Sequence, residues 1–377
     1  MKELAARILE MPKFELHVHM EGATEAETFF RLAQRNNMPL PIPEQDLASW
    51  QKYFEFRDFP HFIEVYVSAV SLLRSAEDYA FLIEEFYRHQ AAQNIIYTES
   101  FLSATYLVDK FDQDEILEAI ARGMEAGKRK YGGEIRFIPD IARQEPESQM
   151  AVLELVKKGY DQGLFLGLGL GGLEIGFPPE IFDEVYCEAR EYGMKVVAHA
   201  GEGVGPESIW GALNTLQAER IGHGVRSIED EKLLTHLAER QIPIEVSPTS
   251  NYCLGIVKPH EQHPIRQMVD AGLNCNINSD DPAMFSTSLT GEYLLLAEQG
   301  FSWEELQQLN RNALEAAFMT EGQKRSYRQL LNDNFAVLDS LDDDAHTLLI
   351  LMLAEQGFSW EELQQLNRNA LEAAFMT

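Results

Sequence analysis

The stretch Phe14-Glu15-Leu16-His17-Val18-His19 is the first of eight short apolar or β-branched runs that recur along the chain. The other seven cover residues 95–101, 135–141, 164–170, 195–199, 220–223, 242–247 and 273–278. Helical patterns, with apolar residues three to four positions apart, separate these runs. Because strands that alternate with helices pair in parallel, and eight such units close a barrel, the sequence predicts an α/β fold, the (β/α)8 TIM barrel.

The barrel pattern is interrupted after its first strand. About 75 residues (20–94) separate His19 from the second run, far more than an ordinary connection between a strand and a helix. This length predicts several extra helices inserted after strand 1. Segments inserted at this end of a strand lie over the mouth of a barrel, so we expect the aromatic stretch 50–56 either to cover a pocket or to pack in the outer layer.

Chemically reactive side chains lie at the carboxyl ends of four of the predicted strands or just after them. They are His17 with His19, His199 with Glu202, His223, and the adjacent pair Asp280 and Asp281. Alternate residues of a strand point the same way, so His17 and His19 can reach one ion together. The carboxyl ends of barrel strands share one mouth, so the four groups are expected to form a single site.

This set of donors predicts a mononuclear metal site for hydrolysis. Imidazole and carboxylate groups are ligands of catalytic zinc, which keeps one position open for water. We expect one Zn²⁺ per chain, with Fe²⁺ or Mn²⁺ as alternatives, held by His17, His19, His199 and Asp280. The metal lowers the pKa of bound water toward about 7.

Three other residues have expected roles around that water. His223 would orient or deprotonate it, and Glu202 would donate a proton to the substrate. Asp281 points away from Asp280 on a strand, so it would bind a polar edge of the substrate. The remaining histidines lack partners in the sequence pattern and are expected to be structural or exposed: His61, His89, His236, His260, His263 and His346.

Composition limits the partners and the location. The formal net charge is −30, from 61 acidic and 31 basic residues among 377. This charge repels phosphate backbones and anionic lipids, so neither nucleic acid nor membrane is an expected partner. Three widely spaced cysteines, no apolar signal core in residues 1–11 and no long apolar stretch predict a reduced, cytoplasmic protein. Nothing in the sequence determines whether it forms homo-oligomers.

Residues 296–320 recur unchanged as residues 353–377, in the sequence LAEQGFSWEELQQLNRNALEAAFMT. Repeats that build a fold diverge, so an identical copy indicates a recent duplication or an artefact of sequence assembly. The unit predicts a helix opened by a capping box, and the first copy is placed to close the barrel after the eighth strand. We expect a catalytic barrel over residues 1–331 and a C-terminal tail over 332–377 that contains the second copy.

At these positions the chain resembles the adenosine deaminase family of metal-dependent hydrolases. The matching segments keep the family's order over roughly residues 11–330: 12–22 (PKFELHVHMEG), 199–202 (HAGE), 205–210 (GPESIW), 220–225 (RIGHGV) and 278–282 (NSDDP). The resemblance implies a (β/α)8 barrel with one zinc. It also implies attack of water on the purine carbon that bears the amino group, with release of ammonia.

The resemblance also implies roles for individual residues. Glu202 would protonate a ring nitrogen, while His223 and Asp280 handle the proton of the water. The expected substrate-binding residues are His19, Glu21, Gly172 and Asp281, with Gly172 at a backbone position that contacts the purine. The expected substrate is therefore a 6-aminopurine.

Two positions depart from the family pattern. Glu21 stands where many nucleoside-specific members carry a ribose-binding aspartate, and adenine-specific relatives often carry glutamate there. Gly169 stands where many members have aspartate. In contrast, the segment 221–224 (IGHG) is more similar to the nucleoside enzymes. Adenosine or 2′-deoxyadenosine is thus the first expected substrate, with adenine, aminodeoxyfutalosine and N6-substituted purines as alternatives.

Other protein classes fit the sequence less well. A binuclear amidohydrolase usually needs a bridging lysine at the end of strand four, and residues 164–176 contain none. The nucleobase deaminases with His-x-Glu and Pro-Cys-x-x-Cys motifs are excluded, because neither motif occurs. A catalytically silent purine-binding barrel is the alternative from another class. Such a protein would be expected to lose a ligand or the acid, and this chain retains all of them.

Overall fold

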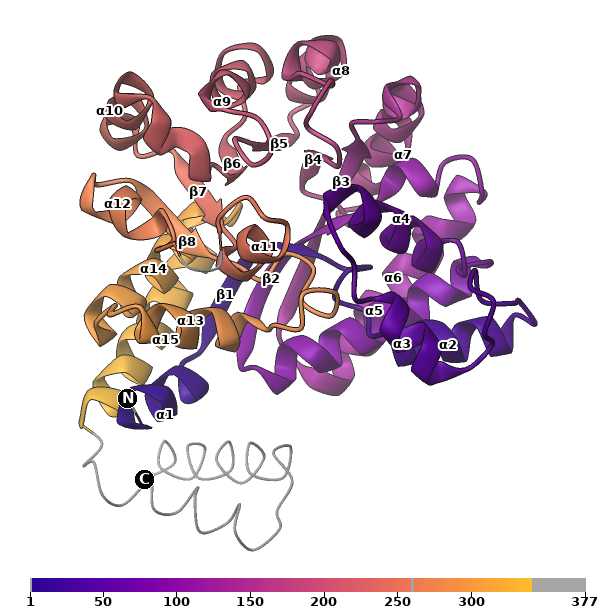
Figure 1. Ribbon diagram of the computed structural model, residues 1–377, viewed down its shortest axis with the longest axis horizontal. Coiled ribbons are helices and arrows are strands. Elements are labelled where there is room, and N and C mark those ends of the chain that lie inside the picture. The colour runs from indigo at the N-terminus through magenta and orange to yellow at the C-terminus, as the bar shows by residue number, and fades with distance from the viewer. Residues whose placement is uncertain (1, 259–260, 341–377) are drawn as a thin grey trace, which may run out of the picture.

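The structure is a computed structural model that describes residues 2–258 and 261–340 (Figure 1). Within this part of the chain, eight strands pair in parallel and in sequence order to form one sheet. The strands are β1 (Lys13–His19), β2 (Ile95–Leu102), β3 (Glu134–Ala142), β4 (Gly167–Gly171), β5 (Lys195–Ala200), β6 (Arg220–His223), β7 (Pro243–Val246) and β8 (Asn274–Ile277).

The sheet closes on itself just beyond β8. Val18 and Asp280 form a parallel bridge, the His19 N–H donates to Asp280 O at 2.8 Å, and the Asp280 N–H donates to His17 O at 3.1 Å. Helices surround the strands in Figure 1 and cover the outer face of the sheet. The prediction of a (β/α)8 TIM barrel is confirmed.

The helices of the described residues follow the strands around the barrel. They are α1 (Lys2–Glu10), α2 (Ala26–Arg35), α3 (Leu47–Tyr53), α4 (Phe59–Val70), α5 (Ala76–Ala92), α6 (Gln113–Tyr131), α7 (Gln149–Asp161), α8 (Asp183–Glu191), α9 (Pro206–Gly211), α10 (Glu231–Arg240), α11 (Pro248–Cys253), α12 (Ile265–Asp270), α13 (Leu289–Glu298), α14 (Trp303–Ala316) and α15 (Glu321–Ser340). Across these described helices, none combines the length and the apolar character needed to span a membrane.

The insertion after β1 forms α2, α3 and α4 ahead of α5, which confirms the extra helices. The aromatic stretch 50–56 packs within this layer. Trp50 is fully buried, stacks on Tyr53 and donates from Nε1 to Ala26 O at 3.0 Å. It is α4 that contributes side chains to the cavity at the barrel mouth.

The first copy of the duplicated segment contributes α14, which packs between β8 and β1. Asn310 accepts from the Phe14 N–H at 3.0 Å and donates to Pro12 O at 2.8 Å, so the helix is tied to the first strand. The capping box predicted at its start is present. The expected domain boundary after residue 331 lies inside α15, and the second copy, 353–377, lies outside the described residues.

Candidate active site

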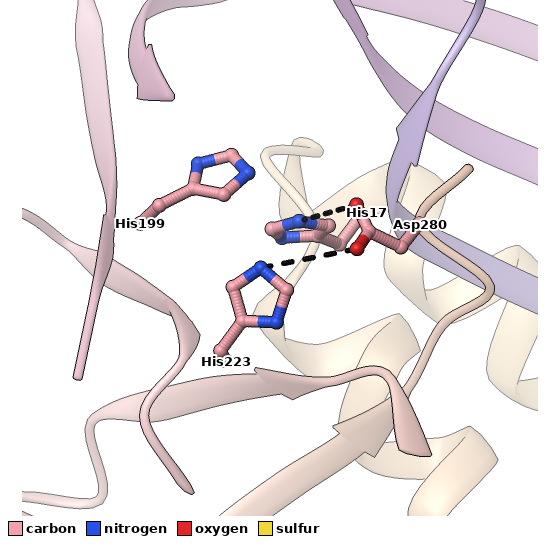
Figure 2. A group of neighbouring side chains, drawn as sticks. All are labelled: His17, His199, His223 and Asp280. Atoms are coloured by element: carbon pink, nitrogen blue, oxygen red, sulfur yellow. Dashed lines mark ion pairs between the residues drawn. The ribbon is translucent and has the colours of Figure 1, made fainter. Parts of the chain in front are cut away.

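The histidines and carboxylates predicted at the strand ends meet at the carboxyl end of the barrel. Two overlapping groups hold their ligating atoms within 4.8 Å of one another: His17, His199, His223 and Asp280 (Figure 2), and His19, Asp280 and Asp281. The Nε2 atoms of His17 and His19 lie 3.5 and 3.4 Å from Oδ1 of Asp280. The structure therefore brings together all four residues predicted to bind the metal.

A β-bulge in β1 aims its histidines into the barrel. The N–H groups of Leu16 and His17 both donate to Oδ1 of Asn278, at 2.8 and 3.0 Å, and the pairing with β2 shifts register here. Two consecutive N–H groups on one acceptor bend the strand and redirect the next side chains. As a result Glu15 faces outward, where it accepts from Gln90 of α5 at 2.7 Å.

Two of the histidines are oriented by groups behind them. Nδ1 of His17 lies 2.9 Å from Oε2 of Glu245, and Nδ1 of His199 lies 2.7 Å from Leu170 O. A carbonyl oxygen only accepts, so Nδ1 of His199 carries its proton and Nε2 presents a lone pair to the site. Histidines that bind metals are commonly held in this way.

The donor set fits a metal ion. Nε2 of His17 is buried and has no hydrogen-bond partner in the described structure. The Nε2 atoms of His19 and His199 lie 3.1 Å apart, close to the spacing of about 3.3 Å that two nitrogens take on one zinc. Three imidazoles and one carboxylate therefore converge on one point with their ligating atoms inward.

Backbone strain and close packing mark the same site. His223 and Asp280 have φ angles of 59° and 63°, a left-handed conformation that costs a residue with a side chain about 1–3 kcal/mol. A Cβ added to Gly22 would lie 1.7 Å from Oδ1 of Asp281, and one added to Gly222 would lie 2.7 Å from Cε1 of His17. Only glycine fits at these two positions.

The loop that carries Glu202 is held by a second carboxylate, which the sequence analysis did not identify. Glu174 accepts from the N–H groups of Gly201, Glu202 and Val204 at 2.7, 3.2 and 2.8 Å. The buried Arg143 donates to His199 O at 2.6 Å, one residue before this loop. Glu174 lies two residues after the glycine predicted to contact the purine, which is the only signal in the sequence that places it nearby.

Burial sets the protonation of the groups that face the cavity. The pKa of Glu202 is raised well above its ordinary value by burial and by the charges of Asp280 and Glu174. The pKa of Asp281 is raised by burial and by its neighbour Asp280. Burial lowers the pKa of His223 to about 3. A protonated Glu202 can donate a proton, as its predicted role requires.

A cavity of about 600 Å³, counting its open mouth, reaches down to these residues. Its lining includes His19, Gly172, Glu202, Asp280 and Asp281, so three of the four residues expected to bind the substrate (His19, Gly172 and Asp281) border the cavity. Its outer wall is mostly apolar and aromatic, with Phe59, Phe62 and Ile63 of α4, Tyr106 and Leu254. None of the described residues that line it is a lysine or arginine.

Glu21 does not itself line this cavity but lies directly behind its wall. Oε1 accepts from the Ser103 N–H at 3.1 Å, and Oε2 accepts from the Tyr66 hydroxyl at 3.3 Å. Ser103 and Tyr66 both line the cavity. Burial raises the pKa of Glu21 to about 7. Glu21 therefore contacts the wall of the cavity through these two residues and does not reach the cavity itself.

Asp140 of β3 is a further cavity residue that the sequence analysis missed. Its Oδ2 lies 3.9 Å from Nδ1 of His19. A Cβ added to Gly169 would lie 3.0 Å from the Cβ of Asp140, so the space beside Gly169 is already filled. The carboxylate that many family members carry at the position of Gly169 thus has a counterpart on the neighbouring strand.

Of the histidines set aside in the sequence analysis, His263 is buried and lies close to the site, while His260 and His346 lie outside the described residues. Nε2 of His263 lies 3.0 Å from Oδ1 of Asn251, which in turn contacts His223. The sequence places His263 in a loop before a short helix, and nothing in that pattern indicates its burial or its contact with Asn251.

The chain matches the model of the adenosine deaminase family over residues 12–334. It is 39% identical to an aminodeoxyfutalosine deaminase of Streptomyces coelicolor, over 84% of this chain and 83% of that protein. It is 37% identical to an adenine deaminase of Bordetella avium, over 81% of this chain and 96% of that protein.

Solved structures give the same result. The adenine deaminase from Arthrobacter aurescens superposes with a TM-score of 0.81 at 28% identity, covering 88% of this chain and 100% of that one. A Zn-bound amidohydrolase from Burkholderia ambifaria superposes with a TM-score of 0.82 at 29% identity, covering 89% and 93%. This chain therefore belongs to the adenosine deaminase family of metal-dependent hydrolases, and it is an aminohydrolase that removes an amino group with water.

Proposed function

We propose that the substrate is a neutral 6-aminopurine and that adenine is preferred, giving hypoxanthine and ammonia. The observation that carries this proposal is the position of Glu21. Both of its carboxylate oxygens accept from the chain's own donors, Ser103 and Tyr66, and neither faces the cavity. No carboxylate is free there to bind a ribose hydroxyl, so we place adenine ahead of adenosine, the substrate first expected from the sequence.

The charge of the cavity supports a neutral substrate. Carboxylates of Asp140, Glu202, Asp280 and Asp281 line it, and no described lysine or arginine does. A phosphate group would find no lysine or arginine among the described lining residues, and burial disfavours its charge. We therefore do not expect nucleotides to be substrates. The similarity to adenine deaminases over most of the chain agrees with this choice.

Aminodeoxyfutalosine is the second candidate, because a deaminase of that name is 39% identical to this chain. Its benzoate-bearing arm would lie along the apolar outer wall formed by Phe59, Phe62 and Leu254. No described lysine or arginine lines that wall, so the benzoate carboxylate would have no partner of opposite charge there. This absence places the larger nucleoside behind adenine.

The proposed roles follow from the geometry of the side chains. A zinc ion held by His17, His19, His199 and Asp280 would supply an activated water at neutral pH. Protonated Glu202 donates to a ring nitrogen of the purine, which makes the carbon that bears the amino group more electrophilic. Asp281 binds a second ring nitrogen. Water adds to the carbon, the carbon–nitrogen bond breaks and ammonia leaves.

The test is a comparison of kcat/KM for adenine, adenosine and aminodeoxyfutalosine, measured as ammonia release from protein of known metal content. We expect the largest value with adenine. The variant Glu21→Asp is too short to keep both hydrogen bonds, so it should lose activity on adenine more than on adenosine. A preference of the parent protein for adenosine or aminodeoxyfutalosine would overturn the choice of adenine.

A further inference from the structure

A buried histidine outside the cavity is linked to the active site by hydrogen bonds between side chains. His263 precedes α12, is 1% exposed and lies behind Asn251 of α11. Its Nε2 lies 3.0 Å from Oδ1 of Asn251, and Nδ2 of Asn251 lies 3.4 Å from Nδ1 of His223. These hydrogen bonds connect His263, just before α12, to the imidazole of His223, which lies beside the predicted metal ligands.

The direction of these hydrogen bonds follows from a donor whose identity is fixed. The backbone N–H of Ile265 donates to Nδ1 of His263 at 3.1 Å, so this nitrogen carries no proton. A neutral ring then carries its proton on Nε2 and donates it to Oδ1 of Asn251. The amide NH₂ of Asn251 is left facing His223, where it donates to Nδ1.

The reverse orientation of the Asn251 amide is disfavoured. It would set the NH₂ group against the Nε2–H of His263, so that two donors would face each other at 3.0 Å. A buried donor without an acceptor loses its hydrogen bond without compensation from water. The Ile265 N–H therefore determines the arrangement through two side chains.

The consequence for His223 is that its proton is held on Nε2. An imidazole that accepts at Nδ1 has its remaining proton on the other nitrogen. That nitrogen lies 3.6 Å from Oε1 of Glu202 and 4.0 Å from Oδ2 of Asp280, on the side of the ring that faces the reaction. With a proton already on Nε2, His223 has no lone pair there to accept one from water.

We propose that His263 and Asn251 are positioning residues that keep the proton of His223 on Nε2. His223 then donates a hydrogen bond to the oxygen of the attacking water, and the carboxylate of Asp280 accepts the proton that this water loses. The carbon–oxygen bond forms as that proton reaches Asp280, and the proton passes on to the amino group that leaves as ammonia. Of the two roles expected for His223, this selects orienting the water; the inference rests on the deamination proposed above.

The sharpest variant is Asn251→Asp, which keeps the shape of the side chain but replaces its only donor with an acceptor. The carboxylate can accept from His263 and from His223, so the proton of His223 should move to Nδ1. A wrong histidine tautomer lowers kcat about 10⁴-fold in serine proteases, and we expect a loss of at least about 100-fold in kcat here. KM and metal content should change little, and Asn332→Asp on the exposed face of α15 is the matched control.

A second pair of variants tests His263 itself. His263→Gln retains a donor near the position of Nε2 and should keep most of the parent kcat. His263→Leu removes the donor, so the Asn251 amide is free to turn and kcat should fall about 10-fold or more. Equal kcat in the Leu and Gln variants would contradict a role for the hydrogen bond and would leave only a packing role.

The direct readout is the tautomer of His223 in the metal-loaded protein, measured by ¹⁵N NMR on histidine-labelled samples and assigned with a His223→Gln variant. We expect the parent protein to carry the proton on Nε2 and Asn251→Asp to carry it on Nδ1. A parent protein with the proton on Nδ1 would overturn the inference whatever its activity. Absence of ammonia release from every purine, with the proton on Nε2, would instead count against the proposed function alone.

Discussion

The two ends of the barrel treat buried charge in opposite ways. At the amino-terminal end of the barrel, the Arg220 guanidinium lies between two carboxylates. Its Nη1 is 2.5 Å from Oε2 of Glu99, and its Nε is 2.6 Å from Oε1 of Glu245. At the carboxyl end, the buried carboxyls of Glu202 and Asp281 have pKa values raised by burial and by neighbouring carboxylates, with no lysine or arginine lining the cavity in the described structure. The Arg220 cluster is thus compensated by opposite charge, whereas the carboxyls of the cavity have no such cation among the described lining residues.

This difference separates structure from chemistry within one fold. The Arg220 cluster ties β6 to β2 and β7, because this buried cation has a carboxylate on each of those two strands. Carboxyls without a cation shift their pKa toward the neutral range, where they can exchange protons with a substrate. Glu245 belongs to both ends, since one oxygen pairs with Arg220 and the other lies 2.9 Å from Nδ1 of His17.

Glu202→Gln should have the largest effect, because it removes the proton donor from the uncompensated end. We expect kcat to fall about 10³-fold, within the range for loss of a general acid, with metal content unchanged. The matched control is Glu207→Gln, an exposed glutamate in the first turn of α9 just after this loop, which should keep parent activity. Parent activity in Glu202→Gln would rule out its assignment as the acid.

Glu245→Gln should affect both ends at once. It removes one of the two negative charges beside the buried Arg220. This should lower the free energy of unfolding by about 3–5 kcal/mol in denaturant titrations. It also weakens the group that orients His17, so metal affinity should fall about 10- to 100-fold. The surface pair of Lys195 and Glu219, 2.7 Å apart, gives the control Glu219→Gln, expected to change stability by at most about 1 kcal/mol. Unchanged metal affinity in Glu245→Gln would show that Glu245 does not support metal binding through His17.

Glu174→Gln should have a smaller effect that is confined to the carboxyl end. Its amide keeps one acceptor oxygen for the N–H groups of the loop that carries Glu202, so this loop should shift slightly. We expect kcat to fall between about 10- and 100-fold with metal content and stability near the parent values. Loss of metal together with activity would mean that Glu174 supports the ligands rather than the acid.

Glu292→Gln should have the smallest effect, visible only in the pH dependence of stability. Burial raises the pKa of Glu292 from 4.5 to about 7, so the folded state binds more protons than the unfolded state between these pH values. Stability is therefore lost as pH rises through this window, by about 3 kcal/mol in total. Glutamine can accept from the Thr249 N–H and donate to the Thr287 hydroxyl, so it should remove this loss.

The check is a series of denaturant titrations of parent and Glu292→Gln from pH 4 to pH 8. The two proteins should diverge as the pH rises, with the variant more stable at pH 8. Parallel curves would show that Glu292 does not titrate in this window.

The barrel was readable from sequence because parallel strands covered on both faces give short, nearly continuous apolar runs. The fourth run showed the limit of this signal. It begins at Leu164, but β4 begins at Gly167. The N–H of Leu164 donates to Gly159 O at 2.9 Å, so Leu164 belongs to the turn that ends α7. Phe165 forms only an isolated bridge with Phe137 of β3 before the regular strand begins.

The predicted ligands were readable because histidine and aspartate stand in recognisable motifs at the carboxyl ends of strands or just after them. The supporting residues were not, since their roles depend on which neighbouring strand or loop lies beside them. Glu174 reaches a loop 27 residues later, and His263 acts through Asn251. Glu15 faces away from His17 because of a bulge that the side chain of Asn278 stabilises, and no sequence period predicts it.

Metal-dependent deamination is tested most directly by ammonia release from adenine, using protein of measured metal content. Activity is measured before chelation, after chelation, and after addition of one equivalent of Zn²⁺, Fe²⁺ or Mn²⁺. We expect loss of activity with the chelator and recovery at one equivalent of metal per chain, with Zn²⁺ effective. Activity that survives complete removal of metal, or no activity with one bound equivalent, would contradict metal-dependent deamination.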